Sequence, residues 1–415
     1  MKLERFEYHE FISPPKMEGK WWEIRKGYGL SQSNSYGEAV GRIFWGVKIT
    51  SDNGYSGLMF GRKPTGSYGS GTATGNVLHP EQDLNDTSFF EANRQSFTKT
   101  WDVLHQFDPM NTEEIGNKIW GLGGNGGVAA ALADMKAKIA GMPFHQMVCG
   151  FGRKRVKAYA SSFCDIGTPE QYGEHAQDCY DLGYRAYKIH PYRCLNPATM
   201  KPAGQNTAFP EWDIEICRAV RAKLGDKMEL MLDPDGVYKT VDDAIMVGKE
   251  LEKLNFKWYE APIIEWKDPE NYGILKAALP DLQFCGPENA PGGLQARVLW
   301  HNNGWCDIIR AGGGFHGICE IATYAKAVGR KCEVHGGGLT AINAIACFPE
   351  DVIEYYEQLL VQPGHSEFGL DYIEGGDAPK FDNGEIIAPT EPGFGYGPNH
   401  WSYAVENSVR SFTLE

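Results

Sequence analysis

Three acidic residues stand where strand-like runs stop. Asp233 ends "ELMLD", Glu260 ends "KWYE" and Glu288 follows "QFCG"; 27 residues separate the first pair and 28 the second. Each interval is about one strand-plus-helix unit, so the three carboxylates should converge and would repel one another unless a cation lay among them. Oxygen ligands favour a hard ion, and Mg²⁺ suits a site that leaves positions open for a substrate. The simpler alternative is that each acid caps a loop or a helix.

Basic residues end two further strand-like runs. Lys188 and His190 lie two apart in "AYKIH", which places both side chains on one face of a strand. His335 ends "KCEVH" and precedes three glycines, which leave room for a ligand. A proton next to a carboxylate is weakly acidic, so its removal needs a base and a cation that stabilises the enediolate. We therefore expect Lys188, His190 and His335 to be catalytic.

Eight strand-like runs alternate with amphipathic helices after about residue 130. They are "VKAYASS", "AYKIH", "ELMLD", "KWYE", "QFCG", "CDIIR", "KCEVH" and "DVIEYY". This alternation predicts parallel strands with helical crossovers, in a (β/α) barrel or in a doubly wound sheet. In both folds the loops that follow the strands carry the site. Residues 1–130 favour a separate α+β unit. The last 45 residues do not continue the alternation of strands and helices, and they are expected to pack on that unit.

Composition excludes several classes of protein. The 415 residues, 42% of them hydrophobic, are enough for a sizeable core, and no apolar run is long enough to span a membrane. The formal charge of −14 disfavours nucleic acid and anionic membranes as partners. Ten cysteines occur singly, without metal-binding pairs. We expect a cytoplasmic protein.

Taken together, these residues resemble the enolase superfamily, specifically its mandelate racemase subgroup. "VKITSDNGYSG" is similar to the capping domain of that family, and "VAAALADMKAKIAGMPFHQMVCG" is similar to the junction that leads into its barrel. The resemblance implies a (β/α)7β TIM-type barrel over residues 131–370. It also implies an α+β capping domain made of residues 1–130 and completed by residues 371–415.

The resemblance assigns roles residue by residue. Asp233, Glu260 and Glu288 would bind one Mg²⁺ at the ends of the third, fourth and fifth strands. Lys188 and His190 would be the basic pair of the second strand, and His335 the histidine of the seventh. Glu354 is implied as an acid of the eighth strand that contacts the substrate. Two further candidates for substrate binding are Asp235, which follows the first metal ligand, and Arg310, which the register of the sixth strand directs inward.

Three departures from the family pattern affect these roles. Asp235 stands where an Asn or similar residue often follows the first metal ligand, which leaves the substrate open. The usual Lys-x-Lys pair is Lys-x-His here, so the base could be Lys188, His190 or His335. Asp307 is a candidate partner for His335, but its spacing from Glu288 fits the start of a strand better than its end. In that register Arg310 and Gly312 face inward, and Asp307 points away.

The expected activity is a Mg²⁺-dependent hydro-lyase reaction on a sugar acid: an aldonate, a uronate such as galacturonate, or an aldarate. Loss of the α-proton and then of the β-hydroxyl would give a 2-keto-3-deoxy acid. Polar loops at residues 20–37 and 196–213 suit a polyol substrate. The alternatives are a racemase or epimerase, a lactone cycloisomerase, and a non-catalytic barrel that binds sugar acids. A homo-oligomer is expected from the resemblance.

Overall fold

The computed structural model describes most of the chain. The described residues are 1–13, 18–30, 42–62, 87–106, 108–111, 126–163, 166–191, 195–203, 207–365 and 379–415. Parts of both polar loops, residues 31–37 and 204–206, lie outside them. No helix in the described ranges is long and apolar enough to cross a bilayer.

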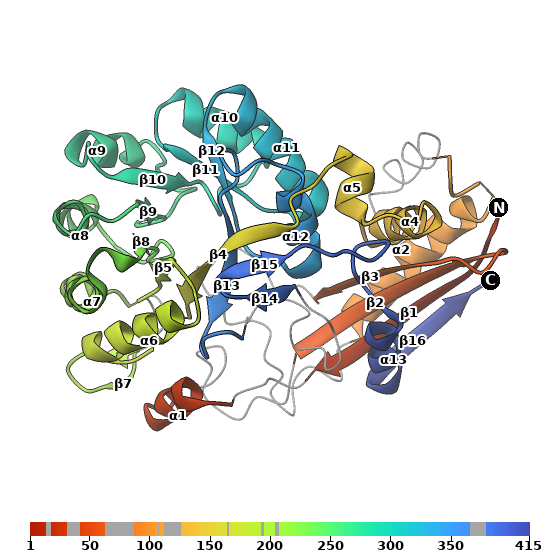
Figure 1. Cartoon of the computed structure of the whole chain (residues 1–415), viewed down its shortest axis with the longest axis horizontal. Helices are drawn as coiled ribbons and strands as arrows, with labels where there is room; N and C mark the ends of the chain where they lie inside the picture. The colour runs from red at the N-terminus through yellow and green to blue at the C-terminus, as the bar shows by residue number, and fades with distance from the viewer. Residues whose placement is uncertain are drawn as a thin grey trace.

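Parallel strands alternate with helices through the larger part of the described chain (Figure 1). The strands are β4 (Arg155–Ser162), β5 (Ala186–Ile189), β8 (Glu229–Leu232), β9 (Trp258–Glu260), β10 (Gln283–Gly286), β11 (Ile308–Ala311), β12 (Lys331–Val334) and β13 (Tyr355–Leu360). The helices between them are α6 (Pro169–Asp181), α7 (Pro210–Leu224), α8 (Val241–Lys253), α9 (Asn271–Ala278), α10 (Leu294–Asn302), α11 (Gly314–Ala327) and α12 (Gly338–Ala346). This order confirms the predicted succession of seven β/α units and a final strand.

One ladder joins these strands in the order β12-β11-β10-β9-β8-β5-β4, and β13 pairs with β4 in parallel. β12 and β13 are in contact, but the described residues show no ladder between them. Cys332 N donates to Val352 O at 2.7 Å below that gap, and Gly338 N donates to the Tyr356 hydroxyl at 2.9 Å above it. The fold is therefore of the (β/α)7β type. The described strands do not close into a complete ring, and hydrogen bonds from residues next to β12 and β13 bridge the gap between them.

Helix starts follow local sequence signals. Thr168 caps α6 in a capping box with Gln171, and Pro169 occupies the first helical position. The Thr240 side chain accepts the N–H of Asp243 at 3.0 Å and caps α8. These signals end each loop at a defined residue, which positions the loops that carry the site.

Two layers of side chains fill the ring of strands. The lower layer is a separate apolar cluster of Tyr159, Ala186, Met231, Trp258, Cys285, Ile308 and Tyr355. Two residues further along most of these strands, on the same face, lie polar groups: Ser161, Lys188, Asp233, Glu260, Arg310 and Glu357. The apolar layer closes the ring from below, so the polar layer faces the ends of the strands.

A four-stranded antiparallel sheet forms the second unit, at the right of Figure 1. Its order is β16 (Ser408–Leu414), β1 (Leu3–Ser13), β2 (Arg42–Ser51) and β3 (Ser56–Arg62). Apolar residues of α2 (Ser88–Leu104) and α4 (Gly126–Ile139) share one core with it, and α13 (Pro398–Glu406) also packs on it. The predicted domain boundary at residues 130 and 131 falls inside α4.

The remaining elements are short and lie around the barrel or between it and the second unit. They are α1 (Lys20–Gly27), α5 (Phe144–Cys149), the 3₁₀ turn η1 (Gly225–Lys227) and the short strands β6 (Leu195–Asn196), β7 (Lys201–Pro202), β14 (Lys380–Asp382) and β15 (Glu385–Ile387). α1 packs on the barrel, where Trp21 Nε1 donates to Asp178 at 2.9 Å. β15 pairs antiparallel with the start of β4, so part of the C-terminal segment contacts the barrel.

Candidate active site

The three predicted metal ligands come together, two of them within the polar layer and Glu288 beside it. Asp233 directly follows β8, Glu260 is the last residue of β9, and Glu288 lies two residues beyond β10. One carboxylate oxygen from each lies within 4.8 Å of the others. Asp233 and Glu260 are buried, and Glu288 is partly buried. The arrangement is a candidate cation site with three oxygen donors.

The donors fit a hard divalent cation. Oε1 of Glu260 is buried and accepts no hydrogen bond from the residues that the structure describes, although Arg310 Nε lies 2.8 Å away. Burial, and the negative charges of Glu260 and Asp233 against the opposing charge of Arg310, raise the pKa of Glu288 well above its usual range. Both features indicate negative charge that a bound cation would balance, and Mg²⁺ prefers such oxygen ligands.

Lys188 is part of the same ion network. Its ammonium group is fully buried and lies 3.1 Å from Asp233 Oδ2, 2.9 Å from Glu260 Oε2 and 2.9 Å from Glu357 Oε1. Burial lowers the pKa of Lys188, but Glu260 and Glu357 outweigh it and raise that pKa well above the usual value. Three carboxylates match the three N–H donors of an ammonium ion, which makes Lys188 a fixed positive charge and a poor base.

The acid on the eighth strand is Glu357, so the prediction of Glu354 is wrong. Glu354 precedes β13 and pairs with Lys257 at 2.9 Å and Lys331 at 2.7 Å, both at the start of other strands. It therefore lies at the end of the barrel opposite the carboxylates. Glu357 contacts Lys188 and lies 2.5 Å from Arg310 Nη2. Burial raises the pKa of Glu357, but these two positive charges hold it well below its usual range.

Arg310 faces inward as the strand register predicts, but its surroundings do not support a role in substrate binding. It is fully buried, and its guanidinium contacts Glu260, Glu357 and the Tyr159 hydroxyl. Its donors are therefore directed at protein groups beneath the candidate cation site. With Lys188 it balances two of the four carboxylates of the site.

Asp307 does not reach His335. It precedes β11, contacts Lys276 at 2.5 Å and accepts the N–H of Phe284 at 2.8 Å. The inward position at the end of β11 belongs to Gly312. His335 thus has no carboxylate partner from this strand.

His190 lies between the first barrel strand and the first acid. Its Nδ1 is 2.7 Å from the carbonyl oxygen of Ser162 and 3.1 Å from Ser161 Oγ, and its Nε2 is 2.9 Å from Asp233 Oδ2. A carbonyl oxygen can only accept, so Nδ1 carries a hydrogen. Nε2 faces a carboxylate, which favours a second hydrogen there. His190 is therefore placed as a proton donor next to Asp233.

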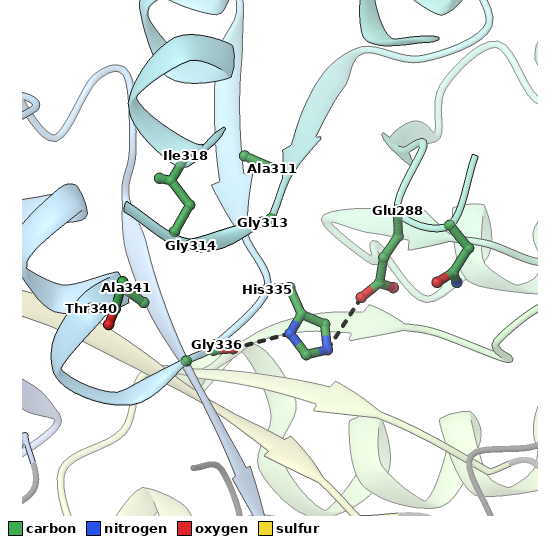
Figure 2. A pocket seen from close by; sticks show the side chains of 12 residues that line it. Glu288, Ala311, Gly313, Gly314, Ile318, His335, Gly336, Thr340 and Ala341 are labelled. Carbon is green, nitrogen blue, oxygen red and sulfur yellow. Dashed lines mark hydrogen bonds and ion pairs between the residues drawn. The ribbon is translucent and has the colours of Figure 1, made fainter. Parts of the chain in front are cut away.

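His335 borders a cavity of about 330 Å³ (Figure 2). Nδ1 is 3.0 Å from Gly336 O, so it carries the hydrogen, and Nε2 lies 3.3 Å from Glu288 Oε1. The side chain keeps 45% of its surface exposed. The cavity is also lined by Asn289, Thr340 and the glycines that follow β11 and β12. Burial lowers the pKa of His335 to about 4, so Nε2 is unprotonated near neutral pH although Glu288 faces it. This nitrogen lies beside the candidate cation site and an open space.

Asp235 supports Asp233 through its backbone. Its N–H donates to Asp233 Oδ1 at 3.0 Å, from a left-handed conformation with φ of 52°. Aspartate tolerates this conformation better than most residues. Contact between the Asp235 side chain and a substrate stays a prediction.

Two residues of the site were missing from the sequence predictions. Glu357 shares its inward face with Tyr355, but the eighth strand was placed a few residues too early. Glu265, a buried acid five residues beyond Glu260, accepts backbone N–H groups from Glu288 and Asn289. A single acid in the apolar stretch "APIIEW" was its one sequence signal.

Known proteins are similar to this chain in sequence and in fold. The chain is 24% identical over 310 residues to the arabinonate dehydratase of Saccharolobus solfataricus, which covers 71% of the chain and 74% of the relative. It is 26% identical to the D-gluconate/D-galactonate dehydratase of Picrophilus torridus, over 72% and 70%. The magnesium-complexed D-glucarate dehydratase from Agrobacterium tumefaciens has the same fold, with a TM-score of 0.70 and 22% identity over 99% of this chain and 100% of that one.

The family model for "Enolase C-terminal domain-like" proteins matches residues 171–402, more than half of the chain and most of the barrel. That match includes the three converging carboxylates, Lys188, His190 and His335. The chain belongs to the Enolase C-terminal domain-like family.

Proposed function

We propose that the protein is a Mg²⁺-dependent dehydratase of sugar acids. The observation that carries the proposal is the cavity that borders both Glu288 and the unprotonated Nε2 of His335. A sugar acid whose carboxylate lies at the cation site would present its α-carbon to His335. The names of the relatives, which specify arabinonate, gluconate and galactonate dehydratases, support the same class of reaction.

Asp233, Glu260 and Glu288 would hold the ion. When bound, Mg²⁺ supplies positive charge that stabilises the negative charge building up on the substrate carboxylate as the α-proton leaves. Lys188 adds a fixed positive charge from below and is itself held by Glu357. Arg310 holds Glu260 and Glu357 in place.

The two histidines divide the proton transfers. His335 removes the α-proton through Nε2, because this nitrogen carries a lone pair and borders the cavity. His190 comes from β5, on the other side of the candidate cation site, and holds hydrogens that can assist departure of the β-hydroxyl as water. The enol that results converts to a 2-keto-3-deoxy acid.

The proposal is tested by a screen for product. Protein treated with EDTA and reloaded with Mg²⁺ is incubated with a panel of aldonates, uronates and aldarates, and 2-keto acids are detected with semicarbazide. We expect product from at least one acid sugar, and none without Mg²⁺ or from His335→Asn. A panel that gives no 2-keto acid refutes dehydration. Exchange of the α-proton without product would indicate an epimerase or racemase instead. Cytoplasmic location and assembly into a homo-oligomer stay predictions.

A further inference from the structure

Glu265 lies beneath the turn that carries Glu288. It follows β9 in the loop that also contains Pro262 and Ile263, and only 1% of its surface is exposed. A buried carboxylate is costly unless its oxygens are used. The groups that use them belong to the candidate cation site.

Both oxygens of Glu265 accept backbone N–H groups from that turn. Glu288 N lies 3.0 Å from Oε1 and 2.9 Å from Oε2, and Asn289 N lies 2.6 Å from Oε2. Burial favours the neutral form of an acid, whereas accepted N–H groups favour the carboxylate, so these contacts stabilise the form that accepts through both oxygens. Two successive N–H groups are thus held by one side chain.

Arg297, on α10, holds the same peptide from its other side. Its Nη2 donates to Glu288 O at 2.8 Å, and its Nη1 donates to Ala290 O at 3.1 Å. Its Nε donates to Arg310 O at 3.0 Å, which ties the turn to β11. The backbone of Glu288 is therefore fixed at both its N–H and its C=O.

Glu288 needs this support more than the other two acids do. Asp233 and Glu260 are at strand ends and contact Lys188, whereas Glu288 lies on a loop. In the described part of the chain its side chain has one ion-pair partner, His335 at 3.3 Å. Repulsion from the neighbouring carboxylates would move an unsupported loop away from the site.

We propose that Glu265 is a positioning residue that preorganises Glu288 for the metal ion, an inference that rests on the Mg²⁺ site of the proposed function. Glu265 does not touch the ion or the substrate. It acts through the two backbone N–H groups, and it lowers the cost of gathering three carboxylates at one point. Residues outside the first layer of ligands typically change metal affinity by about 10–100-fold when substituted.

The test is Mg²⁺ titration of the EDTA-treated full chain by isothermal calorimetry. Glu265→Gln keeps the shape but replaces one acceptor oxygen with an NH₂ group that opposes the backbone N–H groups. We expect its Kd for Mg²⁺ to rise about 10–100-fold. Excess Mg²⁺ should restore most of the kcat, because the catalytic groups are unchanged.

Asp213→Asn is the matched control. Asp213 is also a buried acid, but its carboxylate accepts from the Tyr238 hydroxyl at 2.6 Å and contacts none of the three candidate ligands in the described residues. We expect this variant to bind Mg²⁺ like the wild type, even where its melting temperature changes. A loss of affinity common to both variants would indicate general loosening of the fold and would overturn the proposal.

A second variant covers the case in which Glu265→Gln does not fold, as judged by circular dichroism. Arg297→Lys keeps the charge but cannot donate to several carbonyl groups at once, so we expect it too to weaken Mg²⁺ binding about tenfold or more. Folded variants that bind Mg²⁺ as tightly as the wild type overturn the positioning role and leave the proposed function intact. Wild-type protein that binds no Mg²⁺ refutes the metal site of the proposed function itself.

Discussion

Lys188 Nζ lies 2.9 Å from Glu260 Oε2, inside a ring of strands where neither group contacts solvent. Lys188, which the sequence predicts as a candidate base, therefore forms ion pairs with Asp233 and Glu260, which the sequence predicts as metal ligands. Its charge offsets part of their repulsion, and this relationship determines how the site should respond to substitution.

Lys188→Met removes a positive charge from a buried network of carboxylates. Breaking a buried ion pair from one side typically costs about 3–5 kcal/mol, so the metal-free variant should melt well below the wild type. Mg²⁺ should raise its melting temperature more than that of the wild type, because the cluster is more negative. Thermal denaturation with and without Mg²⁺ measures both effects. Lys276→Met, which breaks the pair with Asp307 outside the site, should show no additional response to Mg²⁺.

Glu357→Gln and Glu354→Gln separate the two ends of the barrel. Glu357 compensates Lys188 and Arg310, so its replacement should lower kcat about 100-fold or more. Glu354 pairs with Lys257 and Lys331 at the opposite end, so its replacement should leave kcat and KM within about twofold of the wild type and change stability alone. Steady-state kinetics with the identified sugar acid measures both effects. If Glu357→Gln and Glu354→Gln lost kcat equally, the placement of these two acids at opposite ends of the barrel would be contradicted.

Gly312→Val tests whether the cavity beside His335 receives the substrate. A Cβ at Gly312 would meet no atom within 4 Å, and the residue has no left-handed φ, so the variant should fold. The new side chain would project into space beside His335 and should reduce kcat/KM about 100-fold, with a smaller effect for Gly312→Ala. Mg²⁺ affinity should not change. Unaltered kinetics in the valine variant would place the substrate elsewhere.

Asp213 should make stability depend on pH. Burial, opposed by the hydrogen bond from Tyr238, raises the pKa of Asp213 to about 8, from an unfolded value of about 4. Between these values the folded state binds the proton and the unfolded state does not, so stability falls as pH rises through this window. In the wild type, Asp213 should lower the free energy of unfolding by up to about 1.4 kcal/mol for each pH unit in this window, and Asp213→Asn should abolish this contribution. Urea unfolding at several values between pH 5 and pH 8 measures the slope, and parallel slopes in the two proteins would contradict the shift.

The succession of strands and the three acids could be predicted because both depend on local pattern. Asp233 and Glu260 follow apolar runs whose ends are visible in the sequence, and one strand-plus-helix unit sets the interval to Glu288. In a parallel barrel this interval is enough to bring the carboxylates together. The inward direction of Arg310 also follows from the two-residue period of its strand.

The eighth strand and the contacts within the ring could not be predicted in this way. Val352 and Ile353 are buried in the turn before β13, so they resemble the strand itself and draw Glu354 into it. The sequence predicts Arg310 as a substrate-binding group because its ion pair with Glu357 is not visible there. Glu357 belongs to a strand two places away around the ring. Glu265 depends on the path of two loops, which periodicity does not describe.

In the proposed reaction, His335 removes the α-proton of a sugar acid held at the site of Asp233, Glu260 and Glu288. The most direct measurement is NMR of the reaction in D₂O with Mg²⁺, with the wild type, His335→Asn and His190→Asn. We predict that the wild type removes the α-proton and forms a 2-keto-3-deoxy acid that carries deuterium at C3. His335→Asn should lose α-proton removal by at least about 100-fold while its Mg²⁺ affinity is retained. Retention of the α-proton by wild-type protein with every acid sugar would contradict the proposed reaction, and undiminished removal by His335→Asn would contradict the role of His335 as the base.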